Sequence, residues 1–290
     1  EADLASFRDS ASGVYLPVVC TEGASGITRL AQRTVLVKRF IDVWGSGATL
    51  AELQQQLRAH TSGRWAPHLA EEVSFKIVVD AFRQHLSDPE RLELINAVAQ
   101  CVPFRGRVRL NSPDQVFVLM IDCSGTASGE AEAGGGTAAG GTGAGLMPSA
   151  GPSAPACCAG AVRFYFGRQV AVGQRDLAAR YDLKQRNYIG TTSLDAELAL
   201  LMANLGRVSG GHLVLDPYCG TAGCLVGAGH FGARVVGADL HGPALRGELR
   251  TRSRWSKCPQ PDRQGIGLTF AQYGLPPPIG LVHADSSRAG

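Results

Sequence analysis

LVLDPYCGTAG, Leu213 to Gly223, is the stretch that decides the fold class of this chain. In it, an apolar run ends in an acid and a proline, and a glycine-rich turn follows. Small apolar residues continue from Cys224 to Phe231, so the pattern predicts a buried strand, a tight loop and the start of a helix. A second apolar run, Arg234 to Ala238, ends in Asp239. This order of elements predicts an α/β domain.

The turn has three features that suit a cofactor containing a nucleoside. Its glycines let the backbone approach a ligand where a side chain would collide. The helix that follows presents unpaired N–H groups at its start. Asp239, at the tip of the second strand, is placed to accept hydrogen bonds from two ribose hydroxyls. We therefore predict a nucleoside-binding site at this turn.

Spacing and charge favour S-adenosylmethionine over NAD at this site. The glycines Gly220, Gly223 and Gly227 do not fit the G-x-G-x-x-G pattern of dinucleotide-binding turns. Asp216 lies close to where a pyrophosphate would have to sit. Its carboxylate would repel phosphate but attract the ammonium and sulfonium charges of S-adenosylmethionine. The alternative is a glycine-rich turn in an ordinary α/β sheet that binds no ligand.

Length and composition bound the other possibilities. The chain has 290 residues, 44% of them hydrophobic, which is enough for two domains. Its net charge of +3 means that any nucleic-acid surface must be local. No apolar run reaches the roughly 18 residues that a membrane-spanning helix needs, so we expect no membrane span. The eight cysteines form no C-x-x-C pair, so we expect no zinc site within this chain. A reducing compartment, cytosolic or nuclear, fits best, and we predict a cytoplasmic location.

Composition divides the chain into three predicted regions, residues 1–64, 65–178 and 179–290. Within the second region, residues 124–160 are almost wholly Gly, Ala, Ser, Thr and Pro. Such a segment cannot bury enough apolar surface to offset its ordering entropy. We therefore expect residues 124–160 to be a disordered insertion.

The first two regions are predicted to mix helices and strands. A helix is expected from Thr49 to Ala59, where Thr49 and Glu52 have the spacing of a capping box. Strands are expected at 14–20, 72–80 and 115–122. A second helix is expected to begin at Ser87, with an apolar stripe of Leu92, Ile95, Val98 and Ala99. A hairpin is expected over 161–172, with its turn at Gly167 and Arg168.

The third region is predicted to add two elements to the strand–turn–helix–strand unit. A helix is expected from Leu194 to Leu205, capped by Thr192 and Ser193. A third strand is expected from Leu281 to Ala284, with Asp285 at its tip.

Several stretches of the chain resemble the eukaryotic and archaeal tRNA guanine-10 N2-methyltransferase family. In the third region these are RNYIGTTSLDAELALLMAN (186–204), DPYCGTAG (216–223) and HFGA (230–233). Upstream, residues 74–80, 103–107 and 111–114 are similar to the THUMP-type RNA-binding half of that family. The resemblance implies an N-terminal α+β region at 1–64, a THUMP-like RNA-binding region at 65–178, and an incomplete class I, Rossmann-like methyltransferase domain at 179–290.

The resemblance also implies an activity and two partners. The activity is methyl transfer from S-adenosylmethionine to the exocyclic N2 amine of guanine 10 in tRNA. The partners are the tRNA and a small zinc-binding activator subunit. The resemblance assigns a cofactor contact to each matching position. Thr192 and Ser193 would contact the methionine end of the cofactor, and Asp216, Gly220 and Gly223 would form the loop around it. Asp239 would bind the ribose, and Asp285 would meet the adenine amine.

Each group of residues that could contact RNA also has a purely structural interpretation. Arg105 and Arg107 flank Gly106 on a predicted turn and are our RNA-binding candidates, against the alternative of a solvated surface. The basic stretch 246–263 offers phosphate contacts or a solvated helix face. The aromatic residues 164–166 suit core packing better than base stacking.

The chain departs from the family in two places. Ala222 stands where the family loop commonly has glycine. The family's catalytic motif, Asn/Asp-Pro-Pro-Tyr, would accept hydrogen bonds from the target amine, and no such run is present. The prolines of Leu275 to Ile279 have no acid or amide before them. We therefore expect a fragment of a longer product, with no catalytic residue in this chain and no methylation by it alone.

Two other functions are left open by the sequence. One is a non-catalytic tRNA-binding protein with a THUMP-like module and a vestigial methyltransferase fold. The other keeps the chemistry but acts on an amine of DNA or protein, which the THUMP-like stretches argue against.

Overall fold

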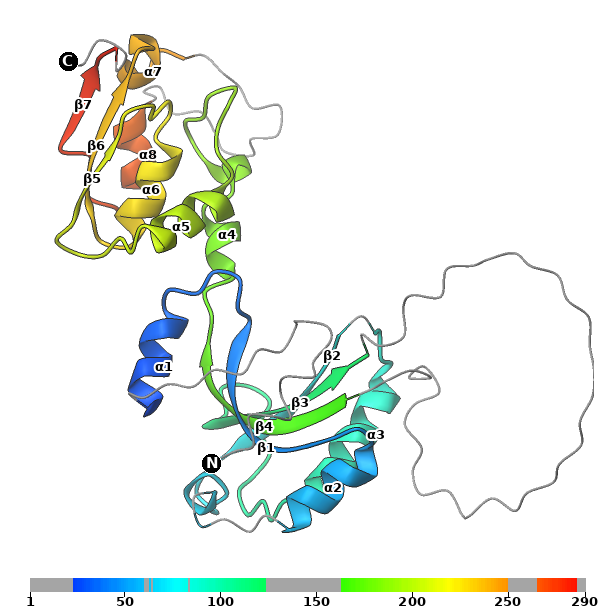
Figure 1. Ribbon diagram of the computed structural model, residues 1–290. Coiled ribbons are helices and arrows are strands. Elements are labelled where there is room, and N and C mark those ends of the chain that lie inside the picture. Colours follow the sequence, from blue (N-terminus) through cyan, green and yellow to red (C-terminus); the bar gives the residue numbers. More distant parts are fainter. Residues whose placement is uncertain are drawn as a thin grey trace, which may run out of the picture. The chain divides into compact units, whose positions relative to one another are not determined.

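The computed structural model describes residues 23–59, 63, 65–82, 84–123, 163–249 and 265–285. The chain divides into two compact units, which Figure 1 colours along the sequence. The first unit holds Glu1–Thr28 and Arg39–Ala171, and the second holds Arg29–Lys38 and Val172–Gly290. The predicted strand at 14–20, the predicted insertion at 124–160 and most of the basic stretch 246–263 lie outside the described residues.

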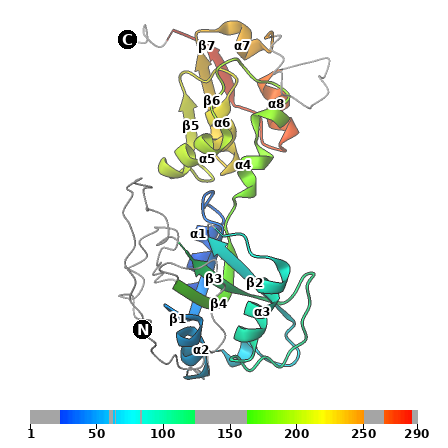
Figure 2. The ribbon, with the colours of Figure 1, turned by 90° about the vertical axis from the view of Figure 1, so that its right-hand side faces the viewer.

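The first unit is built on a four-stranded sheet with the order β1-β4-β3-β2. β2 and β3 are parallel, whereas β3 and β4 are antiparallel. Figures 1 and 2 show helices α2 and α3 on one side of this sheet. In chain order the elements are α1 (Gly23–Ala31, which continues into the second unit), β1 (Arg39–Gly47), α2 (Leu50–Ala59), η2 (Ala66–His68), β2 (Phe75–Phe82), α3 (Asp88–Ala99), β3 (Gln115–Asp122) and β4 (Arg163–Val172).

Strand β1 and helix α2 come from the predicted region 1–64, and they share a sheet and a core with elements of the region 65–178. The boundaries at residues 64 and 178 stay predictions.

Both predicted helices of this unit are confirmed, and their caps explain where they start. Thr49 Oγ1 accepts a hydrogen bond from the Glu52 amide at 3.1 Å, and the Glu52 carboxylate accepts one from the Ala48 amide at 2.8 Å. Ser87 and Glu90 form a capping box ahead of α3. The predicted apolar stripe of α3 is wrong at Leu92, which is 58% exposed, because the buried face is centred instead on Leu94 and Val98.

Aromatic rings fill the core between the sheet and these helices. Trp44 stacks on Trp65 with ring centroids 4.4 Å apart, and its edge meets Phe117 at 5.0 Å. Phe164 and Phe166 are buried in the same core, which confirms that they pack rather than stack on bases. The first unit is therefore held by a large aromatic core.

The hairpin predicted over residues 161–172 is wrong, because β4 runs through Gly167 as one continuous strand. The glycine has a different purpose here. A Cβ at Gly167 would collide with the carbonyl oxygen of Asp42 and lie 2.8 Å from the Cα of Val43 on β1. Gly167 therefore permits close approach of the neighbouring strand and makes no turn.

The second unit contains a three-stranded parallel sheet with the order β5-β6-β7. Helix α6 packs on β5 and β6, and its apolar side joins a core with Val235 and Phe270. The elements are α4 (Asp176–Arg180), η4 (Leu183–Gln185), α5 (Ala196–Leu205), β5 (Leu213–Asp216), α6 (Gly223–His230), β6 (Arg234–Asp239), α7 (Gly242–Arg246), α8 (Ile266–Gln272) and β7 (Gly280–His283).

The predicted cap of α5 is wrong. Asp195, and not Thr192 or Ser193, caps the helix, since its carboxylate accepts hydrogen bonds from the amides of Glu197 and Leu198. The helix begins at Ala196, two residues later than predicted. Ser193 is consequently free of the helix and available to the turn described below.

The prediction that β5 is a buried strand is wrong for one of its faces. Leu213 is 67% exposed and Leu215 is 61% exposed, whereas Val235, in the pair that faces α6, is buried. None of the helices in the described part of the chain is long and apolar enough to cross a membrane.

Candidate functional site

Three acidic residues lie at the carboxyl ends of the parallel strands in the second unit. Asp216 ends β5, Asp239 ends β6, and Asp285 follows β7 by two residues. Asp239 is paired in register with His283, so the tips of β6 and β7 are neighbours. The carboxyl end of a parallel sheet is where α/β proteins bind ligands.

The Asp239 carboxylate is fixed by the turn that it faces. One carboxylate oxygen accepts a hydrogen bond from the Gly220 amide at 2.7 Å, and the other accepts one from the His241 amide at 2.7 Å. Each carboxylate oxygen can accept a further hydrogen bond. Asp239 is therefore held in place with free acceptor capacity, which suits hydroxyl donors of a ligand.

The turn itself has a bent backbone that is open at one side. Gly220 and Ala222 both have left-handed backbone angles, with φ of 51° and 67°. Apart from its chain neighbours, no described atom lies within 4 Å of the position that a Cβ at Gly220 would occupy. The Cys219 amide donates to the Ala238 carbonyl at 2.9 Å and ties the turn to β6. A ligand can thus approach the backbone at Gly220 without displacing a side chain.

Two hydroxyl groups meet beside the turn. Ser193 Oγ lies 3.3 Å from Thr221 Oγ1, and both accept a hydrogen bond from the Gly190 amide. Thr192 is exposed next to this pair. Thr221 was missed in the sequence, although a hydroxyl residue between the glycines of the turn was a usable signal.

The two cysteines of the turn are not nucleophiles. Burial, with the negative charges of Asp216 and Asp239, raises the pKa of the Cys219 thiol to about 12. Burial and then the Asp216 carboxylate also raise the pKa of Cys224. Both thiols are protonated at neutral pH, so the site offers no thiolate for covalent chemistry.

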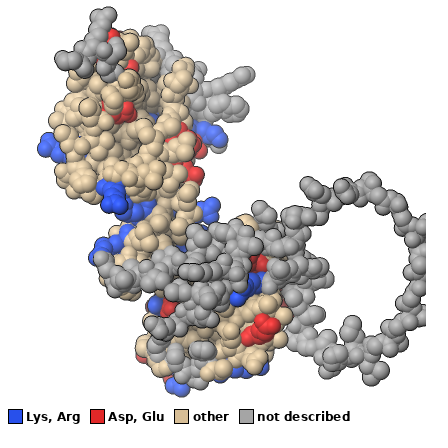
Figure 3. Space-filling view, viewed as in Figure 1, with Lys and Arg blue, Asp and Glu red and all other residues tan. Residues whose placement is uncertain are grey.

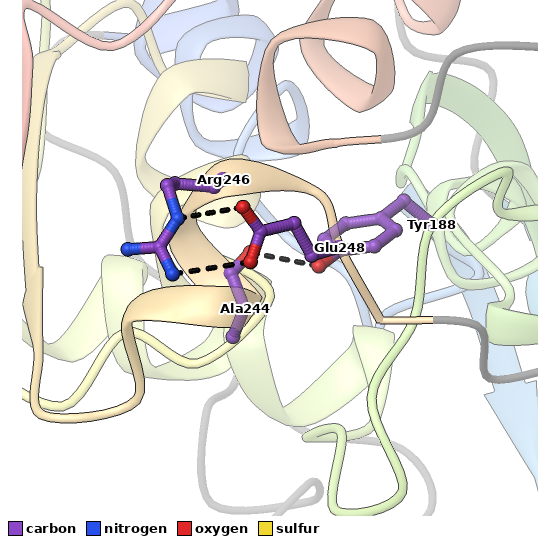
Figure 4. A network of polar contacts seen from close by, with 4 residues as sticks. All are labelled: Tyr188, Ala244, Arg246 and Glu248. Atoms are coloured by element: carbon purple, nitrogen blue, oxygen red, sulfur yellow. Dashed lines mark hydrogen bonds and ion pairs between the residues drawn. The ribbon is translucent and has the colours of Figure 1, made fainter.

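Helix α7, which follows Asp239, is anchored from the segment before α5. The hydroxyl of the buried Tyr188 donates to the Ala244 carbonyl at 2.8 Å. Figure 4 shows this bond beside the paired contacts of Arg246 and Glu248, which lie 2.7 and 3.1 Å apart. The Tyr188 bond ties α7 to the segment before α5, whereas the Arg246–Glu248 pair is a local contact within the chain beyond β6.

The first unit carries the candidates for RNA contact. Arg105 and Arg107 are exposed on the segment after α3. The Phe75 amide donates to the Arg107 carbonyl at 3.0 Å, so this segment is tied to the start of β2. Phe104 anchors it further by stacking on Phe75 with centroids 4.2 Å apart. The two arginines therefore project from a fixed backbone.

The structure brings some predicted residues together and leaves others apart. Gly220 bonds to Asp239, Ser193 meets the turn through Thr221, and Gly223 opens α6 directly after it. Thr192 makes no hydrogen bond to the other site residues within the described part of the chain. Within the described ranges no group of three or more His, Cys, Asp or Glu is arranged to hold a metal ion. In the view of Figure 3 the second unit is largely uncharged at its surface, with scattered acidic and basic side chains.

Two family models match this chain. Residues 5–131 match the one described as the Tmrp11 THUMP N-terminal domain, and residues 184–264 match the one described as the RMKL-like methyltransferase domain. The second match includes the turn and Asp239.

Curated relatives match over most of the chain. It is 32% identical to the tRNA (guanine(10)-N(2))-methyltransferase TRMT11 of Xenopus laevis, over 85% of this chain and 46% of that protein. It is 31% identical to TRMT11 of Gallus gallus, over 94% of this chain and 52% of that protein. The tRNA (guanine(10)-N(2))-methyltransferase of Saccharomyces cerevisiae is 30% identical, over 75% of this chain and 44% of its own length. The chain thus spans about half the length of these relatives.

Among solved structures, TrmN from Thermus thermophilus is similar with 15% identity and a TM-score of 0.38, covering 80% of this chain and 55% of that one.

Proposed function

The chain belongs to the TRMT11 family of tRNA guanine-10 N2-methyltransferases, with a THUMP N-terminal domain and a methyltransferase domain, and from that premise we propose that it binds S-adenosylmethionine and tRNA for methylation of guanine 10 at N2. The turn at 216–223 with Asp239 would be the cofactor site. The first unit would be the RNA-binding part.

One observation carries the cofactor assignment. The Asp239 carboxylate is already held by two amide donors and faces a glycine whose Cβ position is open. A ribose offers two neighbouring hydroxyl donors, which match the acceptor capacity left on that carboxylate. The residues present therefore fit an adenosyl group.

The other site residues would orient the rest of the cofactor. Asp216 would attract the positively charged end. The hydroxyls of Thr192 and Ser193 would contact the methionine end, and Asp285 would meet the adenine amine. When bound, S-adenosylmethionine supplies a methyl group on a sulfonium sulfur, and the chain's own residues contribute binding and orientation.

Arg105 and Arg107 would contact phosphates of the tRNA, and a small zinc-binding activator subunit would be a second partner in a cytoplasmic complex. Methylation is expected to need a residue that accepts hydrogen bonds from the target amine. Because the Asn/Asp-Pro-Pro-Tyr run is absent from these 290 residues, we propose that this chain alone binds the cofactor but does not methylate.

Calorimetry with S-adenosylmethionine tests the cofactor site. We expect Asp239→Asn to weaken binding by about tenfold or more, because a charged acceptor of two hydroxyls is lost. Asp176→Asn, which changes an exposed acid on α4, is the matched control and should leave the affinity unchanged. Equal binding by wild type and Asp239→Asn would contradict the ribose assignment.

Fluorescence anisotropy with tRNA tests the first unit. Replacing Arg105 and Arg107 together by Ala should weaken binding and lower the salt dependence by roughly 0.7–0.9 per lost phosphate contact. Arg58→Ala, an exposed change on α2, serves as the control. If both variants behave alike, the arginine assignment is wrong.

A second candidate function is a non-catalytic tRNA-binding protein. It is favoured by the same absent motif and would predict tRNA binding that does not respond to S-adenosylmethionine. The calorimetric titration separates the two, since only the first requires the cofactor to bind.

A further inference from the structure

Arg186 lies beneath the glycine-rich turn and is almost completely buried, with 3% of its surface exposed. One terminal nitrogen of its guanidinium donates a hydrogen bond to the Thr221 carbonyl at 2.8 Å. The other lies 3.8 Å from the position that a Cβ at Gly223 would occupy. The positive charge therefore sits directly under the first residue of α6.

This charge has no acidic partner in the described part of the chain. The ion pairs found there join other residues, and the Arg186 Nε has no hydrogen-bond acceptor among the described atoms. Burial lowers the pKa of Arg186 to about 10, so the side chain still carries its charge at neutral pH. A buried cation without a counter-charge is unfavourable in the free protein.

The position of Arg186 adds to this imbalance. The start of a helix carries a partial positive charge and N–H groups without intrahelical acceptors. The start of α6, at Gly223, and the guanidinium thus place two positive ends side by side. The hydroxyls of Ser193 and Thr221 lie at the same place. Together these groups favour an anion at this end of the turn.

A charge of the opposite sign, that of Asp216, also lies near the start of α6, at Cys224. The Cys224 thiol senses both charges, because Asp216 raises its pKa in addition to burial, whereas Arg186 lowers it. A carboxylate and a guanidinium thus both lie close to Cys224, the second residue of α6. A ligand that bears an ammonium and a carboxylate on one carbon atom matches this pair of charges.

We propose that Arg186 is a positioning residue that makes the turn selective for an amino-acid carboxylate, acting through the Thr221 carbonyl and the start of α6. The inference rests on the proposed function and deepens it, since the methionine moiety of S-adenosylmethionine carries such a carboxylate. Arg186 itself needs no contact with the ligand.

The test compares two ligands that differ only in this group, S-adenosylmethionine and decarboxylated S-adenosylmethionine. Calorimetry on the full 290-residue chain gives the ratio of their affinities. Wild type should prefer the carboxylate form by about tenfold or more. Arg186→Gln keeps a donor but loses the charge, and its ratio should fall to near one. Arg186→Lys keeps the charge and should restore part of the preference.

Each outcome decides a separate point. Equal losses for both ligands in Arg186→Gln would overturn the proposal, because a purely structural role weakens both alike. A lysine variant that behaves as the glutamine variant would also overturn it. Should either variant fail to fold, as judged by circular dichroism, the wild-type ratio decides, and a ratio of one overturns the proposal. If wild type binds neither ligand, the proposed function itself fails.

Discussion

The two sheets of this protein differ in how completely other parts of the chain cover their faces. The four-stranded sheet of the first unit packs an aromatic core in which Phe117 is fully buried. The three-stranded parallel sheet of the second unit is covered by α6 on one face, while Leu213 and Leu215 on the other are mostly exposed. Parallel sheets are normally covered on both faces.

The difference shows that the two units depend on different interactions. In the first unit large side chains provide the stability. The candidate RNA-binding residues Arg105 and Arg107 lie on a segment that is held by hydrogen bonds and ring stacking. In the second unit the proposed cofactor site depends on backbone geometry, namely the turn, its two left-handed residues and the amide bonds to Asp239. Stability there relies on one-sided packing.

The largest expected effect tests the aromatic core. Phe117→Ala should lower the free energy of unfolding by about 3–5 kcal/mol, because it empties a fully buried site. Guanidinium unfolding followed by tryptophan fluorescence measures it, since Trp44 contacts Phe117. Leu92→Ala on the exposed side of α3 is the control, with a change within about 0.5 kcal/mol. Similar losses for both would break the contrast between core and surface.

The next largest expected effect is a loss of stability in the segment that carries Arg105 and Arg107. A Cβ at Gly106 would collide with the Val73 carbonyl and lie 3.0 Å from the Ala70 carbonyl. Gly106→Ala should therefore cost about 1–3 kcal/mol by forcing the segment away. Gly63→Ala, whose Cβ would meet nothing within 4 Å, is the matched control in a thermal melt. A neutral Gly106→Ala would show that the segment is not held as described.

A smaller effect tests the cap of α5 in the second unit. Asp195→Ala should cost about 1 kcal/mol, because two amides lose their acceptor. Thr192→Ala should change the unfolding free energy by less than about 0.5 kcal/mol, since Thr192 is exposed and is not the cap. The reverse order in urea unfolding would restore the sequence-based cap.

The smallest effect sharpens the contrast between the two faces of the parallel sheet. Leu215→Ser should leave the unfolding free energy unchanged within about 0.5 kcal/mol, because this side chain already faces solvent. It should also reduce self-association in light scattering, since an exposed apolar patch is smaller. Val235→Ala, on the buried face, should cost about 2 kcal/mol. A large loss at Leu215 would mean that this face is covered.

Local signals in the sequence predicted much of this fold. The strand Gln115–Asp122 has the predicted limits, and the cap residue Ser87 marked the start of α3. The strand–turn–helix unit was predicted from an apolar run and its glycines. These features depend on residues that are neighbours in the chain.

The errors lie where distant residues decide the structure. Gly167 was taken for a turn because its partner strand, β1, is far away in the chain. The bond from Arg186 to Thr221 spans 35 positions, and no local pattern announces it. Two acceptable cap residues, Thr192 and Ser193, precede Asp195 and led to a predicted start of α5 two residues too early; the bonds of Asp195 to two amides fix the start at Ala196.

Ala222 fixes the shape of the turn before any ligand arrives. Its left-handed backbone costs an alanine about 1–2 kcal/mol, and the packing around its buried side chain offsets that cost, whereas a glycine there would sample several shapes. Because the turn is ordered in the free protein, ligand association should proceed in one phase, at a rate proportional to concentration and with little adaptation of the backbone. The packing around Ala222 thus favours a turn whose backbone changes little when a ligand binds.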